Sequence, residues 1–297
     1  MSPCRRQFAA PAKVNFGLRI LGKRPDGYHA VQTILQMLNL CDWLTFCANE
    51  TGVIRLICRP STLPTDDGNL VVRAAKLLQQ TCHVRQGVEI TLDKRIPIAA
   101  GLGGGSSDAA ITLLVLNHLW RLQRPQATLH HLSAQLGSDV PFFLGGPTAL
   151  AAGRGEVLSP TSPPSSLSGV LVNPGFGVSA GWAYRQFNGQ SSATDLTIPS
   201  ILQALGDGDL AALAAVMVND LQPGVAMAYP IIRQAREALR AVGAPVTFMT
   251  GSGPTVGGIF PLAVDLQAVV ASLRRYSAWT VIPFTTLSEP FHPELRC

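Results

Sequence analysis

A glycine-rich stretch in the first half of the chain constrains the fold more than any other feature. Residues 98–110 read IAAGLGGGSSDAA, and the preceding VEITLDKRIP alternates like a strand and ends at Pro97. Apolar residues then recur at helical spacing, at Ala109, Leu113, Leu116 and Trp120. We expect Ser106, Ser107 or Asp108 to cap this helix. The predicted order is therefore strand, glycine loop, helix.

Two familiar nucleotide-binding patterns do not fit this chain. Read from Gly101, the dinucleotide pattern G-x-G-x-x-G reaches Ser106 instead of a glycine, and no acidic residue follows at the required distance. The P-loop pattern fits Gly17 to Lys23, but Arg24 stands where a hydroxyl is needed. The turn-forming Pro25-Asp26-Gly27 also disfavours the helix that a P-loop requires.

A glycine loop followed by hydroxyls at a helix start remains. Glycines let backbone N–H groups approach an anion closely, and a helix N-terminus adds partial positive charge. Ser106 and Ser107 can bond phosphate oxygens or a metal ion, so the loop suits a triphosphate. The alternative is a flexible turn before a capped helix, although three consecutive glycines exceed what a cap needs.

The rest of the chain predicts two α+β domains, residues 1–158 and 159–297. Strands are expected at 12–21, 31–40, 43–47 and 53–58, and helices at 69–80 and 128–136. The Pro- and Ser-rich LSPTSPPSSLSG, residues 158–169, gives the boundary. Beyond it we expect a strand at 169–172, helices near 200–205, 210–219 and 230–242, and two strands around a glycine turn within 246–260. The elements alternate without regular βαβ spacing, which favours α+β.

Composition excludes several classes of function. Hydrophobic residues make up 47% and charged residues 14%, as in a globular protein. The net charge is +5, but the basic residues are scattered along the sequence without a run of like charge, so no nucleic-acid partner is expected. The apolar run at 210–218 is too short to span a membrane, and the six cysteines lack metal-binding spacing, which favours free thiols in a reducing cytoplasm. No metal ligands are assigned from the sequence, and a metal ion could be held by a side chain or chiefly by nucleotide oxygens and water.

Three motifs occur in one order along essentially the whole chain. PAKVNFGLRILGKRPDGYH starts at Pro11, GLGGGSSDAA at Gly101 and GSGPTVGG at Gly251. Together they resemble the GHMP kinase superfamily, specifically its 4-diphosphocytidyl-2-C-methyl-D-erythritol kinase branch. The resemblance implies an N-terminal ATP-binding β-α domain and a C-terminal substrate-side α+β domain. It also implies ATP- and Mg²⁺-dependent phosphorylation of the 2-hydroxyl of this cytidine diphosphate compound, in the non-mevalonate route to isoprenoid precursors.

The resemblance assigns catalysis to Lys13 and Asp139. Lys13 stands in the apolar APAKVNFG, and Asp139 is a lone acid in LGSDVPFF. Asp139 would be the catalytic base, and the lysine would favour its ionised form. A solvated lysine and a turn-capping aspartate are the alternative readings.

For ATP, the resemblance places Asn69 and Lys94 around the adenine, although a helix cap and a surface charge would also explain them. The phosphate cradle comprises Pro97, Ile98, Ala99, Ala100, Gly101, Leu102, Gly103, Gly104, Gly105, Ser106 and Ser107. The Gly251–Thr255 turn would add backbone donors near the phosphates or the substrate diphosphate, or would be only a hairpin turn.

The substrate side is assigned to Asn15, Tyr28, His29 and Tyr184. An aromatic ring can stack on a pyrimidine, and an imidazole can hydrogen-bond its edge. Trp182 is the rival to Tyr184 as the second aromatic wall. The expected partner is a small molecule, and the protein is expected to be a monomer or homodimer.

Two departures and two alternatives stay open. Gln222 stands where an acidic residue is expected, and Gly257-Gly258 replaces a bulkier pair. A homoserine- or mevalonate-type kinase would share the fold, but GKRPDGYH argues against it because those relatives read no cytosine. A basic RNA-binding module would leave the glycine loop unexplained.

Overall fold

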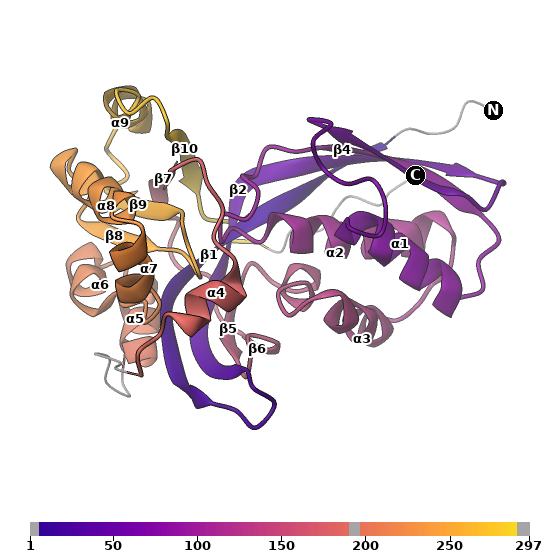
Figure 1. The fold of residues 1–297 in the computed structure, drawn as a ribbon, viewed down its shortest axis with the longest axis horizontal. Coiled ribbons are helices and arrows are strands. Elements are labelled where there is room, and N and C mark those ends of the chain that lie inside the picture. Colours follow the sequence, from indigo (N-terminus) through magenta and orange to yellow (C-terminus); the bar gives the residue numbers. More distant parts are fainter. Residues whose placement is uncertain (1–5, 190–196, 290–297) are drawn as a thin grey trace.

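Two sheets with helices packed against them make up the computed structural model, which describes residues 6–189 and 197–289 (Figure 1). The larger sheet contains β1 (Arg6–Lys23), β2 (His29–Asn49), β3 (Ile54–Arg59), β4 (Gly87–Asp93), β5 (Thr148–Ala152) and β6 (Val157–Pro160). Its order is β3-β4-β2-β5-β6, with β1 pairing along β2. Only β3 and β4 are parallel among these pairs of described strands.

Two helices, α1 (Leu70–Thr81) and α2 (Gly104–Leu119), pack against this sheet, and α3 (Gln126–Leu136) packs on those two helices (Figure 1). Together they build the first core. Asn69 caps α1 as predicted, since its side chain accepts a hydrogen bond from Val71 N at 3.0 Å. Gly137 ends α3, as predicted, and the short 3₁₀ helix η1 (Pro141–Leu144) follows.

The second half surrounds an antiparallel sheet of order β10-β7-β9-β8. Its strands are β7 (Ser168–Asn173), β8 (Val246–Met249), β9 (Val256–Phe260) and β10 (Thr280–Thr285). Its helices are α4 (Ala180–Arg185), α5 (Thr197–Asp207), α6 (Leu210–Val216), α7 (Gln222–Ala228), α8 (Ile231–Ala241) and α9 (Leu266–Leu273). The predicted α+β class is confirmed.

A third core joins the two halves. Alternate residues of β1, namely Ala12, Val14 and Phe16, are fully buried against the second half. The Phe16 ring meets that of Phe248 edge-on, with centroids 5.3 Å apart. After β10 the chain returns to β2, where Leu287 N donates to Met37 O at 3.0 Å. The predicted boundary after residue 158 lies within β6 and stays a prediction.

The predicted cap of α2 was wrong. The helix begins at Gly104, and its N-cap is Gly103 with a left-handed φ of 70° and no side-chain hydrogen bond. Glycines can enter the first turn because nothing on them clashes, so Ser106, Ser107 and Asp108 lie inside the helix. The Asp108 carboxylate makes an ion pair with Lys94 instead of capping.

Other boundaries also differ from the predictions. The strands expected at 31–40 and 43–47 form one strand, β2, because β1 pairs along nearly its whole length. Helix α6 ends at Val216 instead of Asn219, because the backbone of Val218 and Asp220 pairs with Leu18. The elements that were not predicted are η1, α4, α7, α9, β5, β6 and β10. The four described cysteines, Cys41, Cys47, Cys58 and Cys82, are free, while Cys4 and Cys297 lie outside the described residues.

Candidate active site

Three pockets adjoin one another in a row, and the first of them lies at the start of α2. The loop pocket, about 440 Å³, is lined by the glycine loop and the start of α1. The central pocket, about 180 Å³, contains Lys13 and Asp139 and shares Gly101 and Gly103 with the loop pocket. The outer pocket, about 600 Å³, meets the central one along a shared border, formed by Ser138, Arg154, Ala180 and Tyr184. A ligand in the loop pocket and a ligand in the outer pocket can therefore meet at Lys13 and Asp139.

The loop pocket gathers nearly all residues predicted to hold a nucleotide. Asn69, Lys94 and every residue from Pro97 to Ser106 line it. Ser107 does not, because its hydroxyl is fully buried and has no hydrogen-bond partner among the described residues. The structure thus brings the predicted cradle together, and its role in binding ATP stays a prediction.

The backbone of this loop is arranged for an anion. Ala99, Gly101 and Gly103 have left-handed φ angles of 52°, 76° and 70°. Such alternation forms concave nests of backbone N–H groups. No side chain caps the adjoining start of α2, so its first N–H groups and the helix dipole face the same place.

Gly103 is required by contact as well as by φ. A Cβ at this position would stand 2.8 Å from Lys13 Cγ and 2.9 Å from Phe143 Cζ. The absence of a side chain therefore lets the glycine loop lie directly against the lysine of the central pocket.

The central pocket places Lys13, Asn15 and Asp139 together, as the family resemblance implies. Lys13 and Asn15 are two positions apart on β1 and share one face of the strand. Lys13 Nζ donates to Asn15 Oδ1 at 2.7 Å and lies 3.5 Å from Asp139 Oδ2. The lysine is buried, while the Asp139 side chain is 37% exposed and lies in the loop between α3 and η1. Asp139 therefore has a cationic partner and stays open to a substrate.

Residues from the second half hold this group in place. Thr250 Oγ1 accepts a hydrogen bond from Asn15 N at 3.0 Å. Asn219 Nδ2 donates to the carbonyl oxygens of Met249 and Gly251, both at 2.8 Å. Gly251 and Ser252 line the central pocket, so the predicted glycine turn reaches the site. Neither Asn219 nor Thr250 was predicted, and no local motif distinguishes them.

The outer pocket contains Tyr28, His29 and Tyr184. The rings of His29 and Tyr184 are stacked, 5.5 Å apart and 14° from parallel. Burial, with a contribution from the charge of Asp139, raises the pKa of Tyr184 to about 12, so its hydroxyl keeps the proton. Trp182 instead packs edge-on against Tyr229. The geometry favours Tyr184 over Trp182 as the aromatic wall.

Arg154 is a further residue of the site that sequence reasoning missed. It borders both the central and the outer pocket, and its guanidinium carbon lies 4.9 Å from the centre of the Tyr28 ring. Its Nε lies 3.5 Å from Glu156 Oε1. The signal available in the sequence was the pair of glycines that flank Arg154 in AAGRGE. In the structure both glycines have positive φ angles.

The two departures lie away from the pockets. Gln222 opens α7 and lines none of the three. Gly257 is on β9, where a Cβ would stand 2.4 Å from Phe248 Cζ, so the Phe248 ring takes the space that a bulkier residue would need.

Comparisons with known proteins agree with this geometry. The GHMP kinases N terminal domain model matches residues 69–147, and the GHMP kinases C terminal model matches residues 201–278. The chain belongs to the GHMP kinase family. This GHMP kinase is 45% identical to the 4-diphosphocytidyl-2-C-methyl-D-erythritol kinase of Pelotomaculum thermopropionicum, covering 90% of this chain and 92% of the relative. It is 40% identical to the enzyme of the same name from Geobacter metallireducens, over 94% and 97% of the two chains.

Solved structures place this GHMP kinase in the same branch. A crystal structure of 4-(cytidine 5'-diphospho)-2C-methyl-D-erythritol kinase is 34% identical, with a TM-score of 0.82 over 95% of this chain and 99% of that one. A homoserine kinase from Cytophaga hutchinsonii is 16% identical with a TM-score of 0.78, over 99% and 98% of the chains, which shows a shared fold alone. Within the described part of the GHMP kinase, no helix is long and apolar enough to cross a membrane.

Proposed function

We propose that this kinase transfers the γ-phosphoryl group of ATP to the 2-hydroxyl of 4-(cytidine 5'-diphospho)-2-C-methyl-D-erythritol. The observation that carries the proposal is the position of the Lys13–Asp139 pair between the loop pocket and the outer pocket. The names of the relatives and of the structural neighbour supply the identity of the acceptor.

ATP would lie in the loop pocket with its phosphates at the start of α2. The nests of the glycine loop and the uncapped N–H groups of α2 supply donors to the phosphate oxygens. Asn69 and Leu70, at the start of α1, line the same pocket, and the adenosine would bind beside them. The γ-phosphate would then be directed toward Gly101 and Gly103, which border the central pocket.

Asp139 would accept the proton of the acceptor hydroxyl. A base must lie within hydrogen-bond reach of the proton it removes, and the half-exposed Asp139 carboxylate faces the pocket through which both ligands meet. Lys13, whose Nζ lies 3.5 Å from Asp139 Oδ2, would add positive charge where the phosphoryl group passes. Asn15 fixes the Lys13 ammonium by its hydrogen bond.

The cytosine would bind in the outer pocket beside His29, Tyr28 and Tyr184. Its diphosphate would then cross the border between the outer and central pockets. Arg154 lies on that border and has a permanent positive charge that suits a diphosphate.

Magnesium would enter with the nucleotide. Within residues 6–189 and 197–289, no group of three or more His, Cys, Asp or Glu side chains is placed to hold a metal ion. This donor set fits an ion held chiefly by phosphate oxygens and water, with the Ser106 hydroxyl at the pocket wall. When bound, the ion neutralises charge on the β- and γ-phosphates.

A coupled ADP-release assay tests the proposal. Purified protein with Mg·ATP should turn over the cytidine diphosphate alcohol, and the uridine analogue, mevalonate and homoserine should react far more slowly. Absence of turnover with the cytidine compound, while ATP still binds, would contradict the proposed acceptor.

A further inference from the structure

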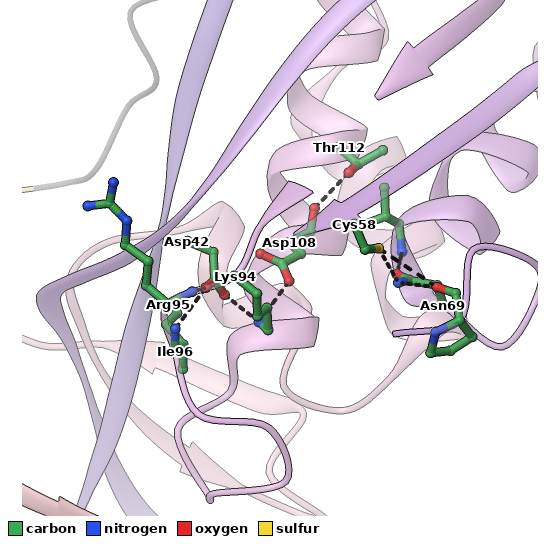
Figure 2. A network of polar contacts seen from close by, with 10 residues as sticks. Asp42, Cys58, Asn69, Lys94, Arg95, Ile96, Asp108 and Thr112 are labelled. Atoms are coloured by element: carbon green, nitrogen blue, oxygen red, sulfur yellow. Dashed lines mark hydrogen bonds and ion pairs between the residues drawn. The ribbon is translucent and has the colours of Figure 1, made fainter. Parts of the chain in front are cut away.

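A buried cluster of charges stands behind the glycine loop. Lys94 Nζ lies 3.0 Å from Asp108 Oδ2 and is also hydrogen-bonded to the carboxylate of Asp42 (Figure 2). The side chains of Lys94, Asp42 and Asp108 are only 8%, 0% and 2% exposed. We call these three residues the charge cluster.

The charge cluster fixes the loop at both ends. Asp42 on β2 accepts hydrogen bonds from Arg95 N at 2.6 Å and Ile96 N at 2.8 Å, where the chain leaves β4 (Figure 2). Asp108 lies in the second turn of α2, just past the other end of the loop. Lys94 connects the two carboxylates and would lie 2.7 Å from a Cβ at Gly104. The start of α2 therefore rests directly on the ammonium.

Charge is unbalanced in this cluster when all three groups are ionised, because two carboxylates face one ammonium. Asp108 Oδ1 has no hydrogen-bond partner among the described residues. Burial raises the pKa of Asp108 to about 7, with Asp42 adding to the effect and Lys94 opposing it. Burial lowers the pKa of Lys94, but the two carboxylates outweigh it and the net shift is upward. The unpartnered Oδ1 and the raised pKa together make Asp108 the member of the cluster best placed to accept a proton.

We propose that the charge cluster positions the nucleotide loop and that the protonation of Asp108 controls its affinity for nucleotide. With Asp108 protonated, the cluster is neutral and the loop accepts anionic phosphates. With Asp108 ionised, a net negative charge stands behind the loop and weakens nucleotide binding. The inference rests on the proposed binding of ATP in the loop pocket, which Lys94 and Asp108 both line.

The other titratable and charged groups near Asp108 either pair with different residues, are exposed, or stay in one protonation state near pH 7. Cys58 on β3 is close enough for Asp108 to raise its pKa further after burial, so this thiol stays neutral near pH 7. On α1, Lys76 pairs with Asp67 at the surface and Arg73 is exposed. On β1, Lys13 is directed to Asn15 and Asp139.

Further charges lie near Asp42 and on the helices that pack with α2. The Arg95 guanidinium lies over the Trp43 ring, and burial raises the pKa of Cys41 to about 11. His118 lies in the last turn of α2, and His130 and His131 are on α3. None of these three histidines is among the causes of the Asp108 shift.

Nucleotide binding measured by calorimetry tests the inference without the acceptor. The probe is the non-hydrolysable adenosine 5'-(β,γ-imido)triphosphate with Mg²⁺, at pH 6, 7 and 8. Asp108→Asn is the reference, because its cluster is neutral at all three pH values. The ratio of the wild-type Kd to the Kd of this variant should rise about threefold to tenfold between pH 6 and pH 8. Glu237→Gln, an equal charge change at an exposed site of α8, should follow the wild type.

Proton uptake in the wild type gives a second measurement that needs no variant. At pH 8 the nucleotide is fully ionised, and its binding should raise the pKa of Asp108 further. Calorimetry in two buffers of different ionisation enthalpy should then show uptake of about 0.2–0.5 proton per nucleotide. Zero uptake, or a Kd for Asp108→Asn that follows the wild-type pH profile, would overturn the inference alone. Failure of every variant to bind nucleotide at any pH would overturn the proposed ATP site and the inference with it.

Discussion

Two buried lysines reach the same glycine loop from different sides, and their surroundings suit them to different roles. Lys13 lies against Gly103, and among the described residues it pairs with one carboxylate, that of the partly exposed Asp139 in the central pocket. Lys94 touches Gly104 and is enclosed by Asp42 and Asp108, which are inaccessible to solvent. A cation whose partner is open to a ligand can act on substrate, whereas a cation outnumbered by buried carboxylates holds structure together.

The largest expected effect is on turnover, and it concerns Asp139, the exposed partner of Lys13. Asp139→Asn should reduce kcat by a factor of about 10²–10⁴, because the amide cannot accept the proton of the acceptor hydroxyl. Calorimetry should show nearly unchanged nucleotide binding, since Asp139 lines the central pocket and not the loop pocket. Glu237→Gln serves as the control. Near-normal turnover would remove Asp139 from the mechanism.

Substitution of Lys94, which is enclosed by carboxylates, should lower the stability of the fold. Lys94→Met leaves two buried carboxylates without a cation and should lower the free energy of unfolding by about 3–5 kcal/mol. Lys13→Met should cost much less stability, because water can solvate the half-exposed Asp139, but it should lower turnover. Urea titration and the ADP-release assay measure the two effects.

A double variant makes this contrast sharper. Adding Asp108→Asn to Lys94→Met should recover part of the lost stability, because the amide avoids the cost of either burying a second carboxylate or protonating it. Equal loss of stability in Lys13→Met and Lys94→Met would break the distinction between the two lysines.

The outer pocket extends the comparison to the two ligands. His29→Ala should raise the KM of the cytidine compound about tenfold to 100-fold, because it removes both an imidazole and the ring stacked on Tyr184. The KM of ATP should stay close to the wild-type value, since His29 does not line the loop pocket. An equal rise in both constants would make His29 a structural residue.

The smallest effect concerns the pH dependence of stability. The pKa of Asp108 is raised from 3.8 to about 7 on folding, so its stabilising contribution is full below pH 4 and is lost as the pH rises through 7. Asp108→Asn removes this loss. The stability of the variant relative to the wild type should therefore increase between pH 6 and pH 8, by on the order of 1 kcal/mol. Urea titrations at both pH values measure it, and a constant difference would contradict the shift.

Sequence reasoning predicted the fold class and most of the central site because both rest on local patterns. The glycine loop identified the phosphate cradle, and the period of a strand put Lys13 and Asn15 on one face. Their proximity to Asp139 came only from the family resemblance, since the residues lie in separate elements.

The missed features depend on contacts distant in sequence. Asp42 joins Lys94 and Asp108 from another strand, with no local signal in LCDW. The sequence allows Lys94 to be an adenine contact or a surface charge. The structure excludes the surface charge, because the ammonium is buried between carboxylates, while the adenine contact stays a prediction. The cap of α2 was mispredicted because the Ser-Ser-Asp sequence has good cap chemistry, while the glycines before it can themselves form the first turn.

The core shared by the two halves limits how such a chain can be recombined. Ala12, Val14 and Phe16 on β1 belong to a core to which the second half contributes much of the apolar surface. A fragment ending near residue 158 would leave this apolar row in water and should aggregate when made alone. The two fragments are expected to assemble when produced together. When C-terminal halves are exchanged between related kinases, activity should be kept only if the residues of the new half that pack on Ala12, Val14 and Phe16 have matching shapes.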